Sequence, residues 1–541
     1  MRLLLALAFV LPSIAHAAAM GIDDARHLLS RTGFAPTPAE VREFAALSRD
    51  RGVERILAAT RSEARTPPPA WVGEPVTPRR AIRDMSPEER QAFQRREIER
   101  GLDLRGWWLQ EMVTTPAPLT ERMTLFWHNH FVSSQQKVRS GQLMYRQNVL
   151  LRRHATGNFG ALLHAVSKDP AMVIYLDAAT NRKGEPNENF AREVMELFTM
   201  GEGHYGERDI REAARAFTGW SLDPDTAEFR WRPFQHDTGS KTVLGRSGEF
   251  DGDDVLDILL AQPATADFVA AKLWREFVSP APASDAEKRE LAQVTARLRA
   301  SGYDIRVALR ALFATNAFWA PANRGALVKS PVDLVVGTMR QFEFEIGDPM
   351  PLAVVTAQLG QNLFAPPNVK GWPGGEAWIN SQTLLARKQF AERVFRADEM
   401  RSVAMREPRA GGVDAKAASD ARAIRARRCR HPLRRRPLGG RPRHDRRGAP
   451  GPAATTGQPG SRDGGHARAR AGARARSGLS AQVGGAHAST RLSRVVGRGS
   501  GSLLARAETR ASGARGAIRE PPRARRVEGR QRWVEHRRAA F

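Results

Sequence analysis

The sequence predicts a mainly α-helical globular body with one small β-hairpin, followed by a disordered arginine-rich tail. Three observations lead to this prediction. Motifs that start helices recur through the first 400 residues, apolar residues follow them at spacings of three and four, and the composition changes abruptly after about residue 400. A chain of 541 residues, 41% of them hydrophobic, is also long enough to bury a substantial core.

The N-terminus has the order of a secretory signal peptide. Met1 and Arg2 precede the apolar run 3–11, and the small residues Ala15 and Ala17 follow, so we expect residues 1–17 to be cleaved off. An uncleaved anchor is the alternative, but the run is much shorter than the roughly 20 residues that cross a bilayer. We therefore expect the mature protein in the periplasm or the medium, without a transmembrane segment.

Helix-starting motifs define the body. Three segments place a capping hydroxyl three residues before a glutamate, whose carboxylate can return a hydrogen bond to the backbone of the cap. They begin at Thr37, Ser86 and Ser284, and Ser330 with Asp333 is a variant with a shorter side chain. Residues 18–400 are accordingly predicted to form one helical domain.

Two stretches interrupt the helical pattern. Residues 229–232 alternate between apolar and basic side chains, and residues 241–244 follow the turn-rich segment 237–240. These two stretches are predicted to pair with each other as the hairpin. Residues 65–80 hold several prolines and are predicted to form an extended surface loop.

The basic charge lies almost entirely in residues 401–541. This segment has 35 Lys and Arg residues against 9 Asp and Glu, whereas residues 1–400 have 50 against 49. Arginine, alanine, glycine and proline dominate the segment, and it cannot form a packed core. It is either a tail that binds polyanions or a GC-rich gene read in the wrong frame. We favour the second explanation, because Lys416 is its single lysine.

The nearly neutral body gives no reason to expect nucleic-acid binding. Cys429, the one cysteine, lies in the tail, so the body has no disulfide and no thiol chemistry. The body also lacks a Gly-x-Ser-x-Gly elbow, a phosphate-binding loop and a His-Glu-x-x-His helix. The common hydrolase, kinase and zinc-protease classes therefore have no support.

His128 and His130 form the first candidate for chemistry, in a segment (124–131) that is predicted to be helical. On a helix their side chains lie about 200° apart, so they cannot jointly bind one ion. The letters His-Asn-His suggest a nuclease, but nucleases with this motif need a ββα metal fold. The helical context and the nearly neutral body do not support that class. Either histidine could supply a ligand or carry a proton; the structural alternative places one in the core and one at the surface.

A predicted helix over 187–198 carries the second candidate. Asn189, Glu193 and Glu196 follow each other at spacings of four and three, so their polar groups share one face. Such a trio could bind a divalent cation or supply acid and base groups. In the structural alternative Asn187 or Asn189 caps the helix and the glutamates are a solvated face.

Two loops supply the remaining candidates. At the expected hairpin turn, His236 beside Asp237 could act as an oriented base, although turns need such residues for structural reasons as well. The Gly/Pro-rich segment 368–380 carries Lys370, Trp372 and Trp378. Exposed tryptophans could bind substrate or a partner surface, whereas buried ones would only pack.

Several motifs occur together in a fixed order. They are His27 to Phe34, Phe126 to Phe131, Asn187 to Phe198, Phe217 to Trp220, His236 with Asp237, and Asn368 to Gly375. In these motifs the chain resembles the bacterial exported proteins of the domain of unknown function 1800 family. The resemblance implies export and a shared polar site without a mechanism, and a neighbouring gene for another exported protein. It also implies an ordered helical end, in place of which this chain has the arginine-rich tail.

Two functions follow from these candidates. The first is an exported, metal-assisted hydrolase that acts on an envelope or polymeric substrate and uses a divalent metal. Its catalytic or ligand residues would be Glu193, Glu196, His128, His130 and His236, and its substrate or partner would be bound by Asn187, Asn189, Lys370, Trp372 and Trp378. The alternative is a non-catalytic envelope binding or assembly protein that partners the neighbouring exported protein.

Overall fold

The computed structural model describes residues 18–404, with side chains up to residue 397. The predicted signal peptide (1–17) and all but the first four residues of the predicted tail (401–541) lie outside the described residues. Within them the fold is mainly helical, as predicted, and no helix is long and apolar enough to cross a membrane.

The elements fall into two halves along the chain. The first half comprises α1 Gly21–Thr32, α2 Pro38–Ala45, α3 Arg49–Ala58, η1 Ala70–Gly73, α4 Arg79–Asp84, α5 Pro87–Thr114, α6 Pro118–His130, α7 Gln135–Val138, α8 Gly141–Arg153, α9 Phe159–Ser167, α10 Pro170–Tyr175, η2 Ala178–Thr180, α11 Glu188–Glu193 and η3 Val194–Thr199. The second half comprises α12 Glu207–Ala216, β1 Trp220–Leu222, β2 Phe229–Trp231, η4 Pro233–Gln235, β3 Lys241–Val243, β4 Arg246–Gly248, α13 Gly252–Ala261, α14 Pro263–Phe277, α15 Asp285–Ala300, α16 Ile305–Phe313, α17 Asn316–Trp319, η5 Pro321–Asn323, α18 Pro331–Gln341, α19 Met350–Gln358, η6 Gly375–Trp378 and α20 Ser381–Ala404.

The predicted helix caps are present, with one difference. Thr37, Ser86 and Ser330 each form the reciprocal pair of hydrogen bonds with the residue three positions later. Ser284 accepts the amide of Glu287, but the Glu287 carboxylate accepts from the amide of Ala283 instead of returning to Ser284. The four helix starts are therefore confirmed, and only the return bond at Ser284 differs.

The predicted hairpin is corrected by the structure, because the described residues contain two hairpins with other partners. Strand β2 pairs with β1, and β3 pairs with β4. Asp223 closes the first hairpin by accepting the amides of Asp225 and Thr226. Leu244 and Gly245 close the second with positive φ values of 48° and 78°, as a two-residue turn requires. Each strand thus pairs with its neighbour in the sequence, β1 with β2 across residues 223–228 and β3 with β4 across a two-residue turn.

Two hydrophobic clusters make up the core, and α6 contributes to both. Trp127 of α6 is fully buried in the larger cluster, which draws on α1 to α3 and on α8 to α17. Leu125, from the same helix, belongs to the second cluster, which draws mainly on α5, α8, α18, α19, α20 and the segment before α20. Helix α6 therefore places its C-terminal residues, His128 to His130, between two packed regions.

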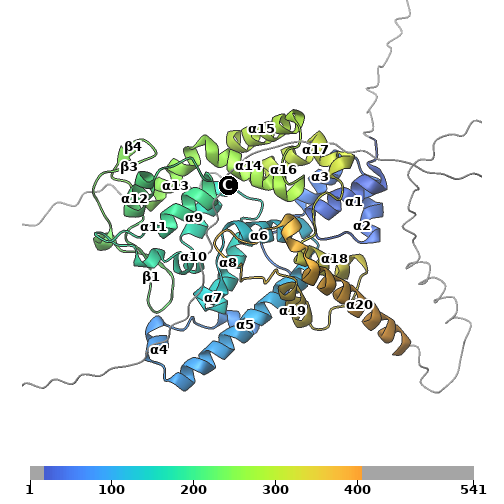
Figure 1. The fold of residues 1–541 in the computed structure, drawn as a ribbon, viewed down its shortest axis with the longest axis horizontal. Helices are drawn as coiled ribbons and strands as arrows, with labels where there is room; N and C mark the ends of the chain where they lie inside the picture. Colours follow the sequence, from blue (N-terminus) through green and yellow to red (C-terminus); the bar gives the residue numbers. More distant parts are fainter. Residues whose placement is uncertain (1–17, 405–541) are drawn as a thin grey trace, which may run out of the picture. The chain divides into compact units, whose positions relative to one another are not determined.

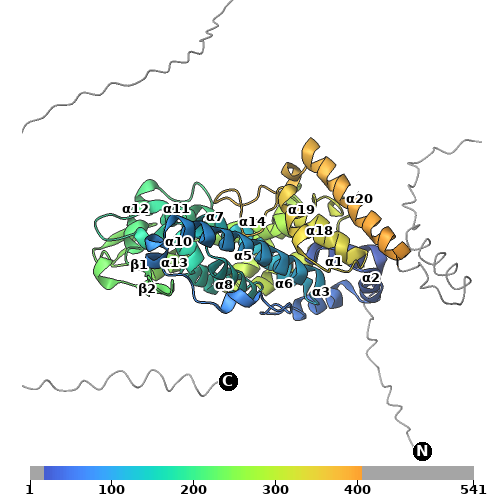
Figure 2. The same ribbon diagram turned by 90° about the horizontal axis from the view of Figure 1, so that it is seen from below.

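The first described helix is tied to elements nearly 300 positions further along the chain. In Figure 1, α1 to α3 lie beside α16 and α17, and Figure 2 shows α1 to α3 at the same end as α18. Nε2 of His27 lies 2.7 Å from the carbonyl oxygen of Phe318, and Arg31 donates to the carbonyl of Asn323 at 2.5 Å. Burial lowers the pKa of His27 to about 4, so its imidazole is neutral.

His164 of α9 bridges two carboxylates of α13. Its Nδ1 lies 3.0 Å from Oδ1 of Asp253 and its Nε2 lies 2.9 Å from Oδ1 of Asp257. Lys168 also contacts Asp253, at 2.7 Å. The hydrogen bond to Asp253 raises the pKa of His164 above 6.5, against the opposing effect of burial. His164 therefore links α9 to α13 through both of its ring nitrogens.

This bridge should make the free energy of unfolding depend on pH. The folded pKa is raised, so the stabilisation is complete below about pH 6.5 and is lost as the pH rises through the folded value. We expect His164→Gln to be less stable than wild type at about pH 6 and to approach it at about pH 9, in urea unfolding at both pH values. An equal difference at both pH values would contradict the prediction.

Candidate functional site

The predicted polar helix contains a π turn. Helix α11 ends at Glu193, and Val194–Thr199 continue it with wider π geometry. The hydroxyl of Thr199 donates to the carbonyl of Val194 at 2.6 Å, which supports the wide turn. The turn buries Met195 completely and leaves Leu197 half-buried, although a regular helix would bury Leu197. Such turns are frequent at functional sites.

The π turn places Glu193 and Glu196 in one polar cluster. Tyr205 donates its hydroxyl proton to Oε2 of Glu196 at 2.9 Å, and Nζ of Lys370 lies 3.7 Å from Oε1. Burial raises the pKa of Glu193, the charge of Glu196 raises it further, and Lys370 opposes both. We call Glu193, Glu196, Tyr205 and Lys370 the Glu196 cluster. It combines two carboxylates, a phenol and an ammonium group.

Lys370 reaches this cluster from a loop that is fixed at its base. Its side chain is largely exposed, and Nζ also lies 3.3 Å from Oε1 of Glu202. The amide of Trp372 donates to Oδ1 of Asn129 at 2.7 Å. Gly371 has φ +81° and packs directly against Asn129, where a side chain would clash. The loop is thus anchored beside the lysine.

The two predicted asparagines orient the helix. Oδ1 of Asn187 accepts the amide of Asn189 at 3.0 Å, so Asn187 is the N-cap of α11. Nδ2 of Asn187 donates to the hydroxyl of Thr180 at 3.1 Å, and Nδ2 of Asn189 donates to the carbonyl of Leu176 at 3.1 Å. Both amides therefore fasten α11 to the preceding segment. Asn187 is a cap as the structural alternative expected, but Glu193 and Glu196 do not form a solvated face, because both are partly buried.

His128 is a core residue and is separate from the cluster. Its Nε2 accepts the amide of Phe364 at 3.2 Å, and the rings of Trp108, Phe364 and Trp372 lie 5.3 to 5.6 Å from its own ring. Burial lowers its pKa to about 3. It is therefore a neutral hydrogen-bond acceptor for the backbone.

His130 uses both ring nitrogens in structural contacts. Its Nε2 lies 3.1 Å from the carbonyl oxygen of Phe198, and Nζ of Lys272 lies 3.0 Å from its Nδ1. Burial holds its pKa well below the ordinary value. The expectation of one surface histidine is corrected here, because both imidazoles are buried.

The two tryptophans of the Gly/Pro-rich loop pack into the second core cluster. Trp372 is 5% exposed and Trp378 is 6% exposed. Trp372 lies against His128, with ring centroids 5.6 Å apart. Neither indole is displayed for stacking on a substrate, so the packing alternative describes both.

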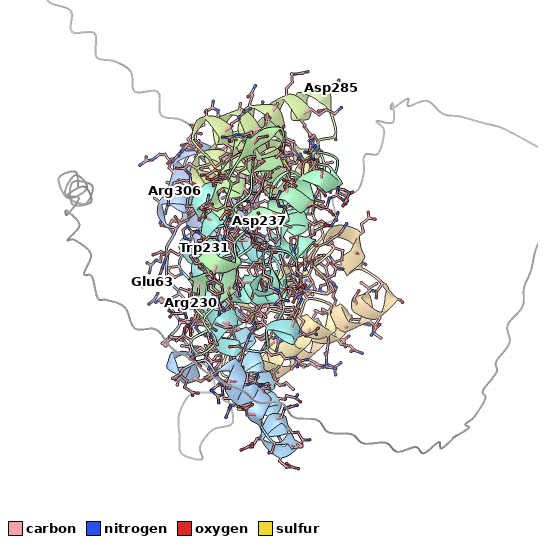
Figure 3. All side chains as sticks on the ribbon, turned by 90° about the vertical axis from the view of Figure 1, so that its left-hand side faces the viewer. Glu63, Arg230, Trp231, Asp237, Asp285 and Arg306 are labelled. Atoms are coloured by element: carbon pink, nitrogen blue, oxygen red, sulfur yellow. The ribbon has the colours of Figure 1, made fainter. Side chains whose placement is uncertain are left out.

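His236 lies in the segment between the two hairpins. Its Nδ1 lies 3.0 Å from the carbonyl oxygen of Thr218, and its ring centroid lies 4.9 Å from that of Trp231. Asp237 pairs with Arg215, which lowers the pKa of Asp237 to about 2. Figure 3 labels Trp231 and Asp237 in this region. No hydrogen bond among the described residues joins His236 to the Glu196 cluster.

Tyr205 and Lys272 are contacts of the π turn that the sequence patterns did not indicate. Tyr205 follows a glycine-rich loop, and Lys272 lies on α14, distant in sequence from α11. Tyrosine is rare in this chain, with four in total. Burial raises the pKa of Tyr175, and the charge of Glu193 adds to that rise. Because tyrosine is rare in the chain, a tyrosine close in sequence to the polar helix is the one signal that could have pointed to Tyr205.

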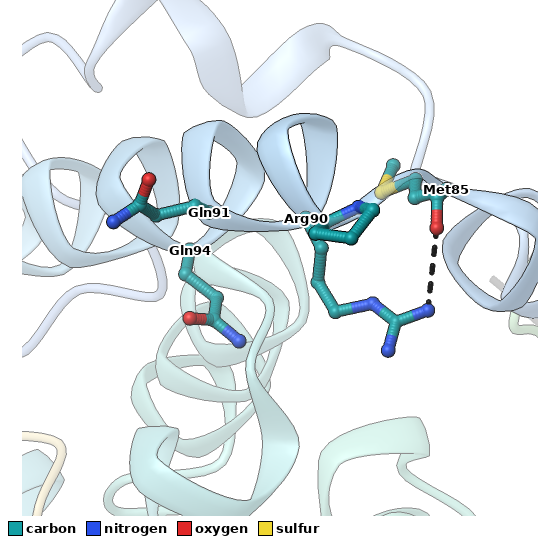
Figure 4. Close-up of a pocket in the computed structure, with 5 residues that line it drawn as sticks. Met85, Arg90, Gln91 and Gln94 are labelled. Atoms are coloured by element: carbon teal, nitrogen blue, oxygen red, sulfur yellow. Dashed lines mark hydrogen bonds between the residues drawn. The ribbon is translucent and has the colours of Figure 1, made fainter.

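Within residues 18–397, no group of three or more His, Cys, Asp or Glu side chains has the arrangement that holds a metal ion. Figure 4 shows a pocket at the start of α5, lined by Met85, Pro87, Arg90, Gln91 and Gln94. It shares no residue with the Glu196 cluster.

The fold and the site define a multi-helical protein with a polar cluster of two carboxylates, a tyrosine and a lysine around a π turn. A family model described as "Protein of unknown function (DUF1800)" matches residues 27–487, and the chain belongs to this family. The match confirms the resemblance seen in the motifs, and it extends past residue 400. No curated protein and no solved structure matches the chain.

Proposed function

We propose that the protein is an exported hydrolase in which Glu193 is the general acid and base. The observation that carries this proposal is the pair of carboxylates at the π turn. Glu193 is half-buried with a raised pKa, whereas Glu196 accepts a hydrogen bond from Tyr205 and pairs with Lys370. Two carboxylates in different environments are the usual arrangement for acid and base work.

In this mechanism the Glu193 carboxylate takes a proton from water while the water oxygen bonds to the electrophilic centre of the substrate. The bond to the leaving oxygen breaks, and Glu193 returns the proton to that oxygen. Lys370 is exposed and can stabilise negative charge that develops on the substrate. The cluster is open to solvent at Lys370, which suits a large envelope or polymeric substrate. Export is proposed because residues 1–17 have the order of charged, apolar and small residues of a signal peptide.

A metal-assisted version would place a divalent cation on Glu193 and Glu196. Nζ of Lys370, at 3.7 Å from Glu196, already brings positive charge to that position. The acid and base version is therefore the better supported of the two.

Glu193→Gln should lower kcat at least about 100-fold, because removal of a general acid or base costs 10²–10⁴ in rate. Wild-type activity should also fall as the pH drops through the raised pKa of Glu193, where the base becomes protonated. The measurement uses the purified protein with chromogenic esters, glycosides and phosphodiesters, and with intact cell-wall polymer.

The matched control is Glu188→Gln on the same helix. The Glu188 carboxylate pairs with Arg192 and lies outside the cluster, so this variant should keep wild-type kcat. The proposal fails if wild type turns over none of these substrates, or if Glu193→Gln and Glu188→Gln have equal activity.

A non-catalytic envelope binding or assembly protein is the second candidate. Leu384 and Leu385 of α20 are more than half exposed, which favours a contact with another protein. A stable complex with the exported protein encoded nearby, formed without turnover, would support this candidate over the hydrolase. Binding that survives Leu385→Glu would argue against α20 as the contact.

A further inference from the structure

Lys272 of α14 is a half-buried amine in an unusual environment. Its Nζ lies 3.0 Å from Nδ1 of His130 and 3.3 Å from the carbonyl oxygen of Leu197, and 4.7 Å from the centre of the Phe268 ring. Among the ion pairs of the described residues, none includes Lys272. A half-buried lysine without a carboxylate partner is costly in its charged form.

The hydrogen bonds around Lys272 match a neutral amine. Nε2 of His130 donates to the carbonyl of Phe198, so Nδ1 of the same ring is an acceptor. The carbonyl of Leu197 is the second acceptor. A neutral amine has two N–H groups, which these two acceptors satisfy, and its lone pair remains available. His130 thus fixes the direction of the lone pair.

We propose that Lys272, oriented by His130, is an amine nucleophile that binds an aldehyde or ketone as an imine. The nitrogen of Lys272 bonds to the carbonyl carbon while the C=O π bond opens. Two protons pass from the nitrogen to the oxygen, which leaves as water, and a C=N bond remains. No oxidant or reductant takes part. His130 is a positioning residue in this proposal, because it acts through Lys272.

The pKa of Lys272 agrees with this geometry. Burial lowers the pKa of Lys272 to about 7, and the charge of Arg275 contributes. At neutral pH about half of the molecules would then carry the free amine, whereas an ordinary lysine with a pKa of about 10.4 is almost fully protonated. Gly201 packs against Phe268, so the amine lies near the loop that also carries Glu202.

The test is reductive alkylation of the full-length protein with propanal and cyanoborohydride, followed by digestion and mass spectrometry of each lysine. Lys288 is the internal control, because it is exposed and pairs with Asp285 at 3.0 Å. We expect Lys272 to be labelled at least tenfold faster than Lys288 at pH 7. Its rate should level off above about pH 8, as expected for an amine with a pKa of about 7.

Two variants complete the experiment. His130→Phe removes the acceptor and should slow labelling of Lys272 several-fold and shift the midpoint of its pH profile. Glu193→Gln should leave labelling of Lys272 unchanged, so this proposal and the hydrolase proposal can fail separately. Labelling of wild-type Lys272 no faster than that of Lys288 at pH 7, or a labelling rate of Lys272 that keeps rising up to pH 10, would overturn the proposal whether or not the variants fold.

Discussion

Replacing Arg152 by methionine should lower the free energy of unfolding by about 3–5 kcal/mol. Arg152 of α8 and Glu121 of α6 are each 1% exposed. The guanidinium donates to the two carboxylate oxygens at 2.7 and 2.9 Å, and Nε1 of Trp108 donates to one of them at 2.8 Å. Without Arg152 the carboxylate stays buried with the indole hydrogen bond, and its charge is no longer balanced.

The measurement is urea unfolding at pH 7, with Arg182→Met as the control. Arg182 also pairs with a glutamate, since its Nε and Nη2 both donate to Oε2 of Glu185, but the two side chains are 60% and 71% exposed. Exposed pairs contribute about 0–1 kcal/mol, so the control should change little. Replacing Glu121 by leucine as well should recover part of the loss, because no buried charge remains. Equal effects of Arg152→Met and Arg182→Met would refute the argument.

Gly371→Ala should be the second large perturbation, at about 2–5 kcal/mol. The left-handed backbone at φ +81° costs an alanine about 1–2 kcal/mol. The added Cβ would also lie 2.7 Å from the backbone oxygen of Asn129 and 2.3 Å from its Oδ1. Displacing packed atoms of this kind costs about 1–3 kcal/mol more.

The same substitution should change the electrostatics of the Glu196 cluster. The loop must move away from Asn129, and Lys370 moves with it. Because the charge of Lys370 lowers the pKa of Glu193, that pKa should rise further in the variant. NMR titration of Glu193 and thermal unfolding measure the two effects. Gly325→Ala is the control, since Gly325 has φ +71° with no atom near its would-be Cβ, and only the conformational cost applies.

Local signals in the sequence predicted most of the fold. A capping hydroxyl and a carboxylate three residues later act within one turn, so the starts of α2, α5 and α18 could be read directly. The hairpins show the limit of this approach. Leu244 with Gly245 is not one of the common turn pairs, and the partner of each strand depends on such turns. The sequence therefore located β2 and β3 but paired them wrongly.

The site was predictable only in part. The spacing of Glu193 and Glu196 placed them on one face, but helical periodicity cannot reveal a π turn over six residues. Lys370 meets Glu196 through the tertiary fold, and Lys272 meets His130 in the same way. Trp372 and Trp378 are buried because the second core cluster recruits them, and a loop pattern does not show which side of a loop faces the core.

The ties between α1 and the α17 region have a consequence for the order in which the chain gains structure. His27 and Arg31 find their partners at Phe318 and Asn323, so α1 cannot dock until synthesis has passed residue 323. Contacts of such long sequence separation slow folding, because a long loop must close first. A nascent chain released before residue 318 would leave the inner face of α1 uncovered. We therefore expect docking of the first helix to be a late step, and short translation products to be recognised by proteases at this end.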